Sequence, residues 1–273
     1  MLVSWEFLDS SATLIDNLAM VDNQRVHWLP TVCRPGPWQM ACDEALLLCA
    51  GGDRVPRFRF YSWSEPTISL GYFQDYRNFL SAFPNLSGLT IVRRLTGGGA
   101  ILHDREITYS LIISADHDLY KKGPIAAYTL VHQAIADCLR ALRVELELRP
   151  KDPNYARVRD EPEFCFARPC PTDLIHPTGK LVGSAQRRLP EAFLQHGSII
   201  LQRRFPDHPT TALEDLVPDP PPPDELEQTF ATEIEKKLQL PFQKREFTPA
   251  ELDRTEQLIP KYAGKDWTVH RQT

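Results

Sequence analysis

The chain has 273 residues, a formal net charge of −5 and 42% hydrophobic residues. This length suits one large domain or two small ones with room for a core, and the acidic balance argues against non-specific nucleic-acid binding. No apolar run approaches the roughly 18 residues of a membrane-spanning helix, and the N-terminus lacks the basic start of a secretory signal. Six cysteines without paired spacing indicate reduced thiols in a cytoplasmic protein.

Apolar periodicity predicts helices and strands along the chain. Residues 38–49 carry one apolar helical stripe, and further helices are expected within 75–88, at 124–143 and 226–238, and from the capping box at Thr248. Strands are expected where aliphatic, β-branched and aromatic residues run together, at 57–63, 67–73, 89–95, 107–114, 144–148, 181–188 and 193–201. Residues 205–223 are rich in proline and predict a semi-rigid connector.

A glycine triplet lies in the stretch RRLTGGGAILHDREITYS at residues 93–110, which reads as a strand, a glycine turn and another strand. Gly97, Gly98 and Gly99 have no Cβ, so backbone there can approach a ligand closely. Successive N–H groups in such a turn can cradle an anion or a carbonyl oxygen, and the two preceding arginines are expected to add positive charge at its mouth. Taken alone, the triplet is equally well explained as a tight turn.

Four motifs in a fixed order resemble the family of lipoate-protein ligases and octanoyltransferases, which is related to the biotin protein ligases. They are PWQMACDEALL at 37–47, WSEPTISLGYFQ at 63–74, the glycine stretch, and GKLVGSAQRRLPEAFLQHGSIIL at 179–201. The resemblance implies an α/β (α+β) fold, a mixed β-sheet with helices on its faces. It implies three segments of the chain, with an N-terminal extension of unclear role at 1–27, a catalytic core at 28–205, and a proline-rich connector and C-terminal helical portion of the same domain at 206–273.

Two residues are the candidates for covalent chemistry within this resemblance. Cys165, in EFCFARPC, is similar to the nucleophilic cysteine of LipM-type octanoyltransferases, whereas ATP-dependent ligases carry no cysteine at this point. Lys180 falls at the family's lysine position. A thiolate can take an acyl group from a thioester almost isoenergetically, and a neighbouring cation lowers the thiol pKa from about 8.5. Cys170, five residues further on, is the alternative thiol.

Other residues are expected to bind substrate, and each also has a structural explanation. His103 is expected either to support the cleft or to bond the Asp104 backbone, and His196 to face an acyl pocket, although a lone histidine is more often structural. Asp43 in the first helix is explained by the helix dipole, with a secondary role at the cleft as the alternative. No metal site is predicted, because no C-x₂-C spacing occurs. The substrate-binding candidates are Arg93, Gly97, Gly98, Gly99, Ala100, His103, Gly183, Ser184, Ala185 and His196.

Three functions stay open from the sequence. The first is an octanoyltransferase without a cofactor, taking octanoyl from octanoyl-acyl carrier protein to a lysine of lipoyl domains or the glycine cleavage H protein; Cys165 and the short chain after Trp267 favour it. The second is a ligase that uses ATP and Mg²⁺, favoured by Gly99, where LipM-type enzymes commonly have arginine. The third is an inactive acyl-binding relative, against which Cys165 and Lys180 both argue. A cytoplasmic monomer is expected.

Overall fold

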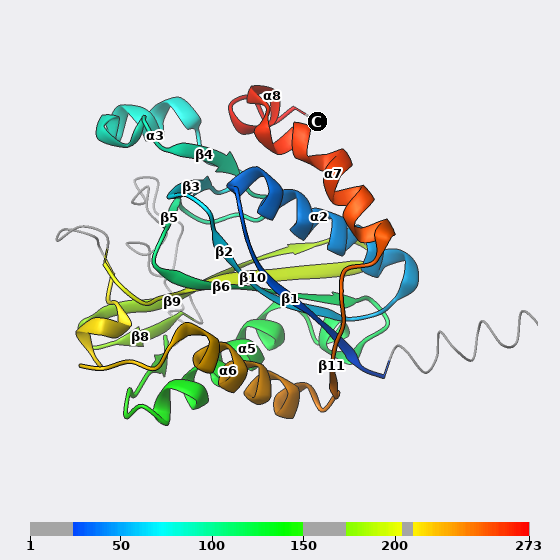
Figure 1. Ribbon diagram of the computed structural model, residues 1–273, viewed down its shortest axis with the longest axis vertical. Coiled ribbons are helices and arrows are strands. Elements are labelled where there is room, and N and C mark those ends of the chain that lie inside the picture. The colour runs from blue at the N-terminus through cyan, green and yellow to red at the C-terminus, as the bar shows by residue number, and fades with distance from the viewer. Residues whose placement is uncertain (1–23, 150–172, 204–209, 273) are drawn as a thin grey trace, which may run out of the picture.

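Two β-sheets and the helices packed on them make up the part of the chain that the computed structural model describes, residues 24–149, 173–203 and 210–272 (Figure 1). The larger sheet has the order β11-β1-β2-β6-β10-β9-β8-β7. Its strands are β1 (Val26–Arg34), β2 (Arg57–Trp63), β6 (Glu106–Ser114), β7 (Glu147–Leu148), β8 (Leu174–His176), β9 (Gly179–Arg188), β10 (Ala192–Ile200) and β11 (Phe242–Lys244). β1 runs parallel to both its neighbours and the other pairs are antiparallel, so the sheet is mixed, as expected.

The smaller sheet carries the glycine turn. Its order is β4-β3-β5, with β3 at Thr67–Leu70, β4 at Thr90–Arg93 and β5 at Ile101–His103, and the short helix α3 (Tyr76–Ala82) precedes β4. β4 and β5 lie on opposite sides of β3. The turn therefore does not make a hairpin of its two neighbouring strands, and the long strand expected after it, β6, belongs to the larger sheet.

One face of the larger sheet is covered by α2 (Gly36–Asp53), which in turn lies under α7 (Pro249–Ala263) and α8 (Lys265–Thr268) (Figure 1). The predicted apolar stripe of α2 is buried at its centre and half-buried at its ends, Trp38 and Cys49, whereas Met40 and Leu47 outside it are buried as well. Met40 and Leu47 are buried because α2 packs between the sheet and α7. A stripe on one side of a helix does not indicate a second packed side. The capping box that was predicted to start α7 is confirmed, with Thr248 and Glu251 each accepting a hydrogen bond from the other's backbone N–H.

The opposite face packs against α5 (Pro124–Arg140) and α6 (Pro223–Leu238), with the short helix α4 (Asp118–Lys121) before them (Figure 1). The predicted stripe of α6 is confirmed, since its Leu, Phe and Ile positions all enter one apolar core. Cys138 on α5 is 4% exposed in this core, and burial raises the pKa of its thiol to about 12. It is thus the core filler that the sequence indicated.

Two neighbouring strands at one end of the larger sheet, β1 and the edge strand β11, were not predicted from the sequence. Pro30 interrupts the apolar run of β1, and the register with β2 shifts between Leu29 and Val32 at this point. β11 has only three residues, too few to show an alternating pattern. β1 begins at Val26, so the first sheet strand starts slightly before the expected core boundary at residue 28.

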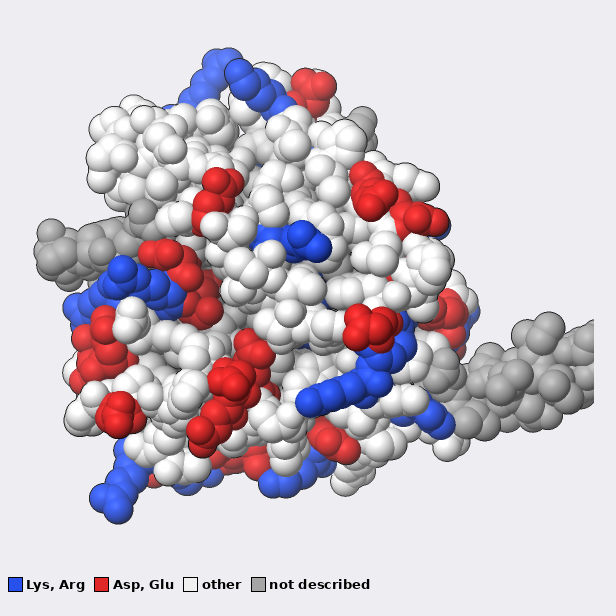
Figure 2. Space-filling model, in the orientation of Figure 1, with Lys and Arg blue, Asp and Glu red and all other residues white. Residues whose placement is uncertain are grey.

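The face of the molecule shown in Figure 2 carries no large field of one charge among the described residues. On the face in Figure 2, basic and acidic side chains are interspersed. Within the described residues, no helix is both long and apolar enough to cross a membrane. Arg203, a partly exposed cation, pairs its guanidinium with Asp215 at 2.9 Å.

Candidate active site

A small pocket lies on the α2 side of the larger sheet, between that sheet and the smaller one. Strands β9 and β10 bring three of the expected residues to it, Gly183, Ser184 and Ala185, together with His196. His103 reaches it from β5. The complete lining is Met40, Tyr61, Ser69, Arg94, Ile101, His103, Thr108, Gly183, Ser184, Ala185, His196, Gly197 and Ser198. Ala100 is not part of it and is buried in the core of the smaller sheet.

The glycine turn is held from inside by Arg94. Its Nη2 donates hydrogen bonds of 2.7 Å to the carbonyl oxygens of both Gly97 and Gly99. Gly98 has a φ of 92°, and its carbonyl oxygen would lie 1.9 Å from a Cβ placed on Gly71. Glycine is therefore required at Gly71 for the close approach and favoured at Gly98 by its backbone conformation.

The expectation that Arg93 and Arg94 put charge at the mouth of the turn is wrong. Arg93 is 0% exposed and donates to the carbonyl oxygens of Gly71, Tyr72 and Gln74 and, across the molecule, Thr268. Burial lowers the pKa of Arg93 to about 10, with a smaller contribution from nearby cations. Arg93 thus ties the smaller sheet to α8, and its guanidinium serves the fold.

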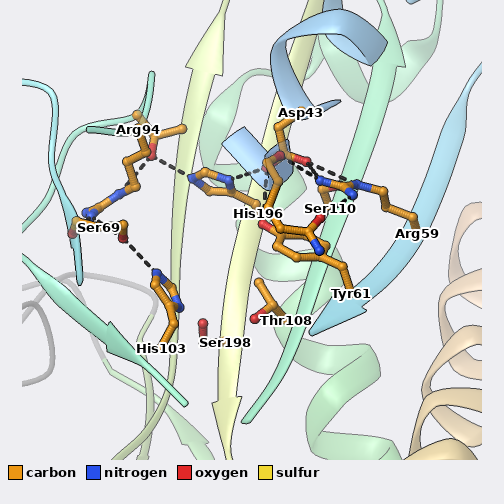
Figure 3. Close-up of polar contacts among 12 residues, drawn as sticks. Asp43, Arg59, Tyr61, Ser69, Arg94, His103, Thr108, Ser110, His196 and Ser198 are labelled. Carbon is orange, nitrogen blue, oxygen red and sulfur yellow. Dashed lines mark hydrogen bonds and ion pairs between the residues drawn. The ribbon is translucent and has the colours of Figure 1, made fainter. Parts of the chain in front are cut away.

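His196 lies in a buried chain of polar contacts (Figure 3). Its Nδ1 is 2.8 Å from Asp43 Oδ2, its Nε2 is 2.7 Å from Thr96 Oγ1, and Asp43 Oδ1 accepts from Arg59 at 2.6 Å. Burial alone would raise the pKa of Asp43, but Arg59 and His196 outweigh it and lower that pKa to about 2. Burial lowers the pKa of His196 despite the adjacent carboxylate. Asp43 is therefore a partner of the pocket histidine, which its explanation by the helix dipole did not reveal.

His103 has a matching arrangement on the other side of the pocket. Its Nε2 is 2.7 Å from Ser69 Oγ, and its Nδ1 is 2.6 Å from Glu106 Oε1. Its ring stacks on Trp63 with the centroids 4.0 Å apart. The side chain thus bonds Glu106. A hydrogen bond to the Asp104 backbone, one of the two alternatives from the sequence, is not formed. Burial would raise the pKa of Glu106, but contacts led by His103 outweigh it and lower the pKa.

Lys180 is buried and paired. Its Nζ lies 2.9 Å from Asp173 Oδ1, and the two side chains are 4% and 5% exposed. Lys180 is therefore a buried, paired cation and not a solvated surface lysine. A buried pair of this kind is costly to break from one side, because the remaining charge is left without a partner in a low dielectric.

A β-bulge sets the direction of Lys180. Lys180 pairs with Ile175, whereas Val182 pairs with the preceding residue, Leu174, so Leu181 is the extra residue of the bulge. Leu174 and Val182 both enter the α5–α6 core. Since successive residues of β8 point to opposite faces, Ile175 and Lys180 lie toward the other face, the one that carries the pocket. Cys165 and Cys170 lie outside the described residues.

Sequence reasoning did not single out Glu106, Asp173, Gly197 or the hydroxyls of Ser69 and Thr96, and it gave Asp43 a role at the cleft only as an alternative. Gly197 is the most restrictive, because a Cβ there would lie 2.5 Å from Gly183 O and 2.6 Å from Ser184 Oγ. Glu106 and Gly197 were inside the recognised motifs, HDREITYS and LQHGSIIL, so their position was a usable signal. Asp173 had no such signal. Within the described ranges, no three His, Cys, Asp or Glu side chains are grouped as metal ligands.

Solved structures with this arrangement of strands and helices include lipoate-protein ligases. Lipoate-protein ligase A bound with ATP has a TM-score of 0.71 at 21% identity, covering 90% of this chain and 98% of that one. The bipartite lipoate protein ligase from Thermoplasma acidophilum has a TM-score of 0.67 at 20% identity, covering 90% and 96%. These likenesses establish the biotin/lipoate protein ligase-like fold that was expected.

Relatives of similar sequence include several octanoyltransferases named LipM. The octanoyltransferase LipM of Moorella thermoacetica is 33% identical over 255 residues, 85% of this chain and 93% of that protein. Those of Kyrpidia tusciae and Bacillus subtilis are 31% and 30% identical, each covering 86% of this chain and 94% of their own. The family model of the lipoyl protein ligase A/B catalytic domain matches residues 35–205. The chain therefore belongs to the lipoyl protein ligase A/B catalytic-domain family.

Proposed function

We propose that the chain transfers an octanoyl group from octanoyl-acyl carrier protein, through a thioester on Cys165, to a lysine of a lipoyl domain or the glycine cleavage H protein. The observation that carries this is the match to octanoyltransferases along at least 85% of the chain. That match identifies an acyltransferase, an octanoyltransferase of lipoate biosynthesis, and does not favour the ligase alternative. We further propose that it works as a cytoplasmic monomer without nucleotide or metal.

The chemistry needs a nucleophile and a fixed positive charge. In the proposed first step, the Cys165 thiolate attacks the thioester carbonyl, the carbon–sulfur bond to the carrier breaks, and the carrier thiol leaves as a thiolate. In the second, the acceptor lysine amine attacks the enzyme thioester, Cys165 leaves, and the amine loses a proton. Lys180, held by Asp173 at 2.9 Å, is suited to stabilise the carbonyl oxygen and the thiolate.

The pocket on the α2 face suits an uncharged acyl chain. Burying hydrocarbon contributes about 0.8 kcal/mol per CH₂, so an octanoyl chain supplies several kcal/mol of binding. Arg94, His103 and His196 line the pocket, yet each points its polar atoms at other protein groups. The wall therefore does not require a charged ligand.

Intact mass spectrometry tests the proposal. Purified protein incubated with octanoyl-acyl carrier protein, in the absence of ATP, should gain one octanoyl adduct that hydroxylamine removes, and should then modify a lipoyl domain. Cys165→Ser should lose the adduct and all turnover, while Cys170→Ser, the matched control, should keep both. An adduct that survives Cys165→Ser, or acceptor modification that needs free octanoate with ATP and Mg²⁺, would contradict it.

A further inference from the structure

Arg94 stands between the two pocket histidines and uses all five of its N–H donors within the protein. Nε donates to Thr96 Oγ1 at 3.1 Å, and Nη1 donates to the carbonyl and hydroxyl oxygens of Ser69 at 2.7 and 3.1 Å. Nη2 donates to the carbonyl oxygens of Gly97 and Gly99. Although Arg94 lines the pocket, these contacts leave it no N–H for an acyl group.

The hydroxyls of Ser69 and Thr96 link Arg94 to the two histidines, and Arg94 determines which way each hydroxyl donates. A guanidinium only donates, so Ser69 and Thr96 accept from Arg94 and keep their own protons for another acceptor. For Ser69 that acceptor is His103 Nε2, and for Thr96 it is His196 Nε2, each at 2.7 Å. Figure 3 shows His103 pointing toward Ser69 on one side and His196 toward Asp43 on the other.

A carboxylate fixes the far nitrogen of each ring. Asp43 Oδ2 accepts a hydrogen bond from the Tyr61 hydroxyl, and Glu106 Oε1 accepts from the hydroxyls of Thr108 and Ser198, so both carboxylate oxygens act as acceptors. Nδ1 of His196 must therefore donate to Asp43, and Nδ1 of His103 to Glu106. With Nδ1 as donor and Nε2 as acceptor, each ring carries one proton and no net charge.

We propose that Arg94 is a positioning residue that holds His103 and His196 in one neutral tautomer, with the proton on Nδ1 and Nε2 accepting a hydroxyl hydrogen bond. The inference rests on the proposed function only in taking the pocket's ligand to be an acyl chain. Both Nε2 lone pairs are used, so neither ring is free to take the proton of the attacking amine. Their role is to keep the pocket wall uncharged and rigid.

Charged groups from every neighbouring element bear on these rings. His196 faces Asp43 from α2, Arg59 through that carboxylate from β2, and Arg94 from the segment after β4. His103 on β5 faces Glu106 from β6, with Ser69 from β3 on its other side. Loss of Arg94 removes the N–H donors that orient the Ser69 and Thr96 hydroxyls, so the Nε2 atom of each ring should lose its fixed hydrogen-bond partner.

Nitrogen-15 NMR of the imidazole rings in the full chain tests this directly and does not depend on turnover. Both histidines should show a protonated Nδ1 and an unprotonated Nε2 at pH 7. Thr96→Val should change the nitrogen-15 pattern of His196 alone, and Ser69→Ala that of His103 alone. Arg94→Lys should change both patterns together. Arg93→Lys is the matched control, because Arg93 is equally buried but bonds only backbone carbonyls, and it should move neither.

The opposite results are equally specific. Nε2–H tautomers or imidazolium rings in the wild type at pH 7, or an Arg94→Lys variant in which both rings keep the wild-type nitrogen-15 pattern, would overturn the proposal. So would a Thr96→Val variant that moves His103 as much as His196. If Arg94→Lys does not fold, Thr96→Val and Ser69→Ala, which each remove one hydroxyl, decide the question. Failure of octanoyl transfer with unchanged tautomers would count against the proposed function and not against this inference.

Discussion

The two faces of the larger sheet are buried in different ways, and β2 belongs to both. Phe58 and Phe60 point from β2 into the α5–α6 core, where their rings lie 4.8 Å apart. Between them, Arg59 points to the α2 face and bonds Asp43. One face is thus filled by apolar packing and the other by partnered charges, within a single alternating strand.

The α5–α6 face contributes mainly to stability, whereas the α2 face carries the pocket. Apolar burial is non-directional, so the α5–α6 face tolerates any well-packed set of hydrophobic side chains. Buried polar groups need partners of defined geometry, so the α2 face admits few arrangements. The pocket lies on the second face, where Arg94, His103 and His196 are each fixed by directional contacts.

The largest effect should come from Lys180→Ala, on the polar side. Losing a fixed cation at the reacting carbonyl should lower kcat by about a hundredfold to a thousandfold or more, measured by acyl transfer to a lipoyl domain. The variant leaves Asp173 buried without its partner, so Lys180→Ala with Asp173→Asn is the control for lost stability. Lys180→Arg should also fail because a guanidinium is larger and planar; turnover near that of the wild type would mean that any positive charge suffices.

Phe230→Ala, on the α5–α6 face, should lower stability and leave activity unchanged. Phe230 packs against Phe60 and Tyr109 with ring centroids 5.6 and 5.2 Å away, so truncation should lower the free energy of unfolding by about 3–5 kcal/mol. Urea unfolding measures this, and kcat/KM per folded molecule should be unchanged. Phe230→Leu should lose less. A loss of kcat in the folded variant would contradict the division between the two faces.

Acid should lower the free energy of unfolding partly through Asp43 on the α2 face. The pKa of Asp43 falls from 3.8 to about 2 on folding, so its contribution to stability is present above pH 4 and is lost as the pH falls through about 2. That contribution amounts to about 2 kcal/mol. Urea unfolding between pH 6 and 2 should show a smaller acid loss for Asp43→Asn than for wild type. Identical pH dependence would show that Asp43 is not a principal acid-sensitive group.

A small effect is expected from Arg187→Glu. Its guanidinium lies 5.6 Å from the centroid of the Tyr72 ring, close in sequence to the pocket-lining Ala185. If acidic carrier domains dock over the pocket, the variant should raise KM for the carrier a few-fold, and its KM should depend less on salt. Arg254→Glu on α7 is the control and should leave KM unchanged. Equal KM and salt dependence in both variants would remove Arg187 from the docking surface.

Much of the fold could be predicted from the sequence because it depends on periodicity. The alternation of Phe58 and Phe60 and the stripe of α6 report burial directly, and both were confirmed. The polar side is harder, because partners come from distant segments. Asp43 and Arg59 are 16 residues apart, and Asp43 and His196 are 153 apart. Charge before a glycine turn suggested an exposed anion site, whereas Arg94 satisfies carbonyls that only the folded chain brings near. Catalysis by Cys165 stays a prediction.

The contact between Arg93 and Thr268 has a consequence for the order of folding during synthesis. The two residues are 175 positions apart, and β1, near the start of the described chain, takes β11 as its outer neighbour. Closing so long a loop is entropically costly and slow. While α8 is still unsynthesised, Arg93 lacks the backbone oxygen that receives two of its hydrogen bonds. The smaller sheet should therefore reach its final arrangement only after α8 has left the ribosome.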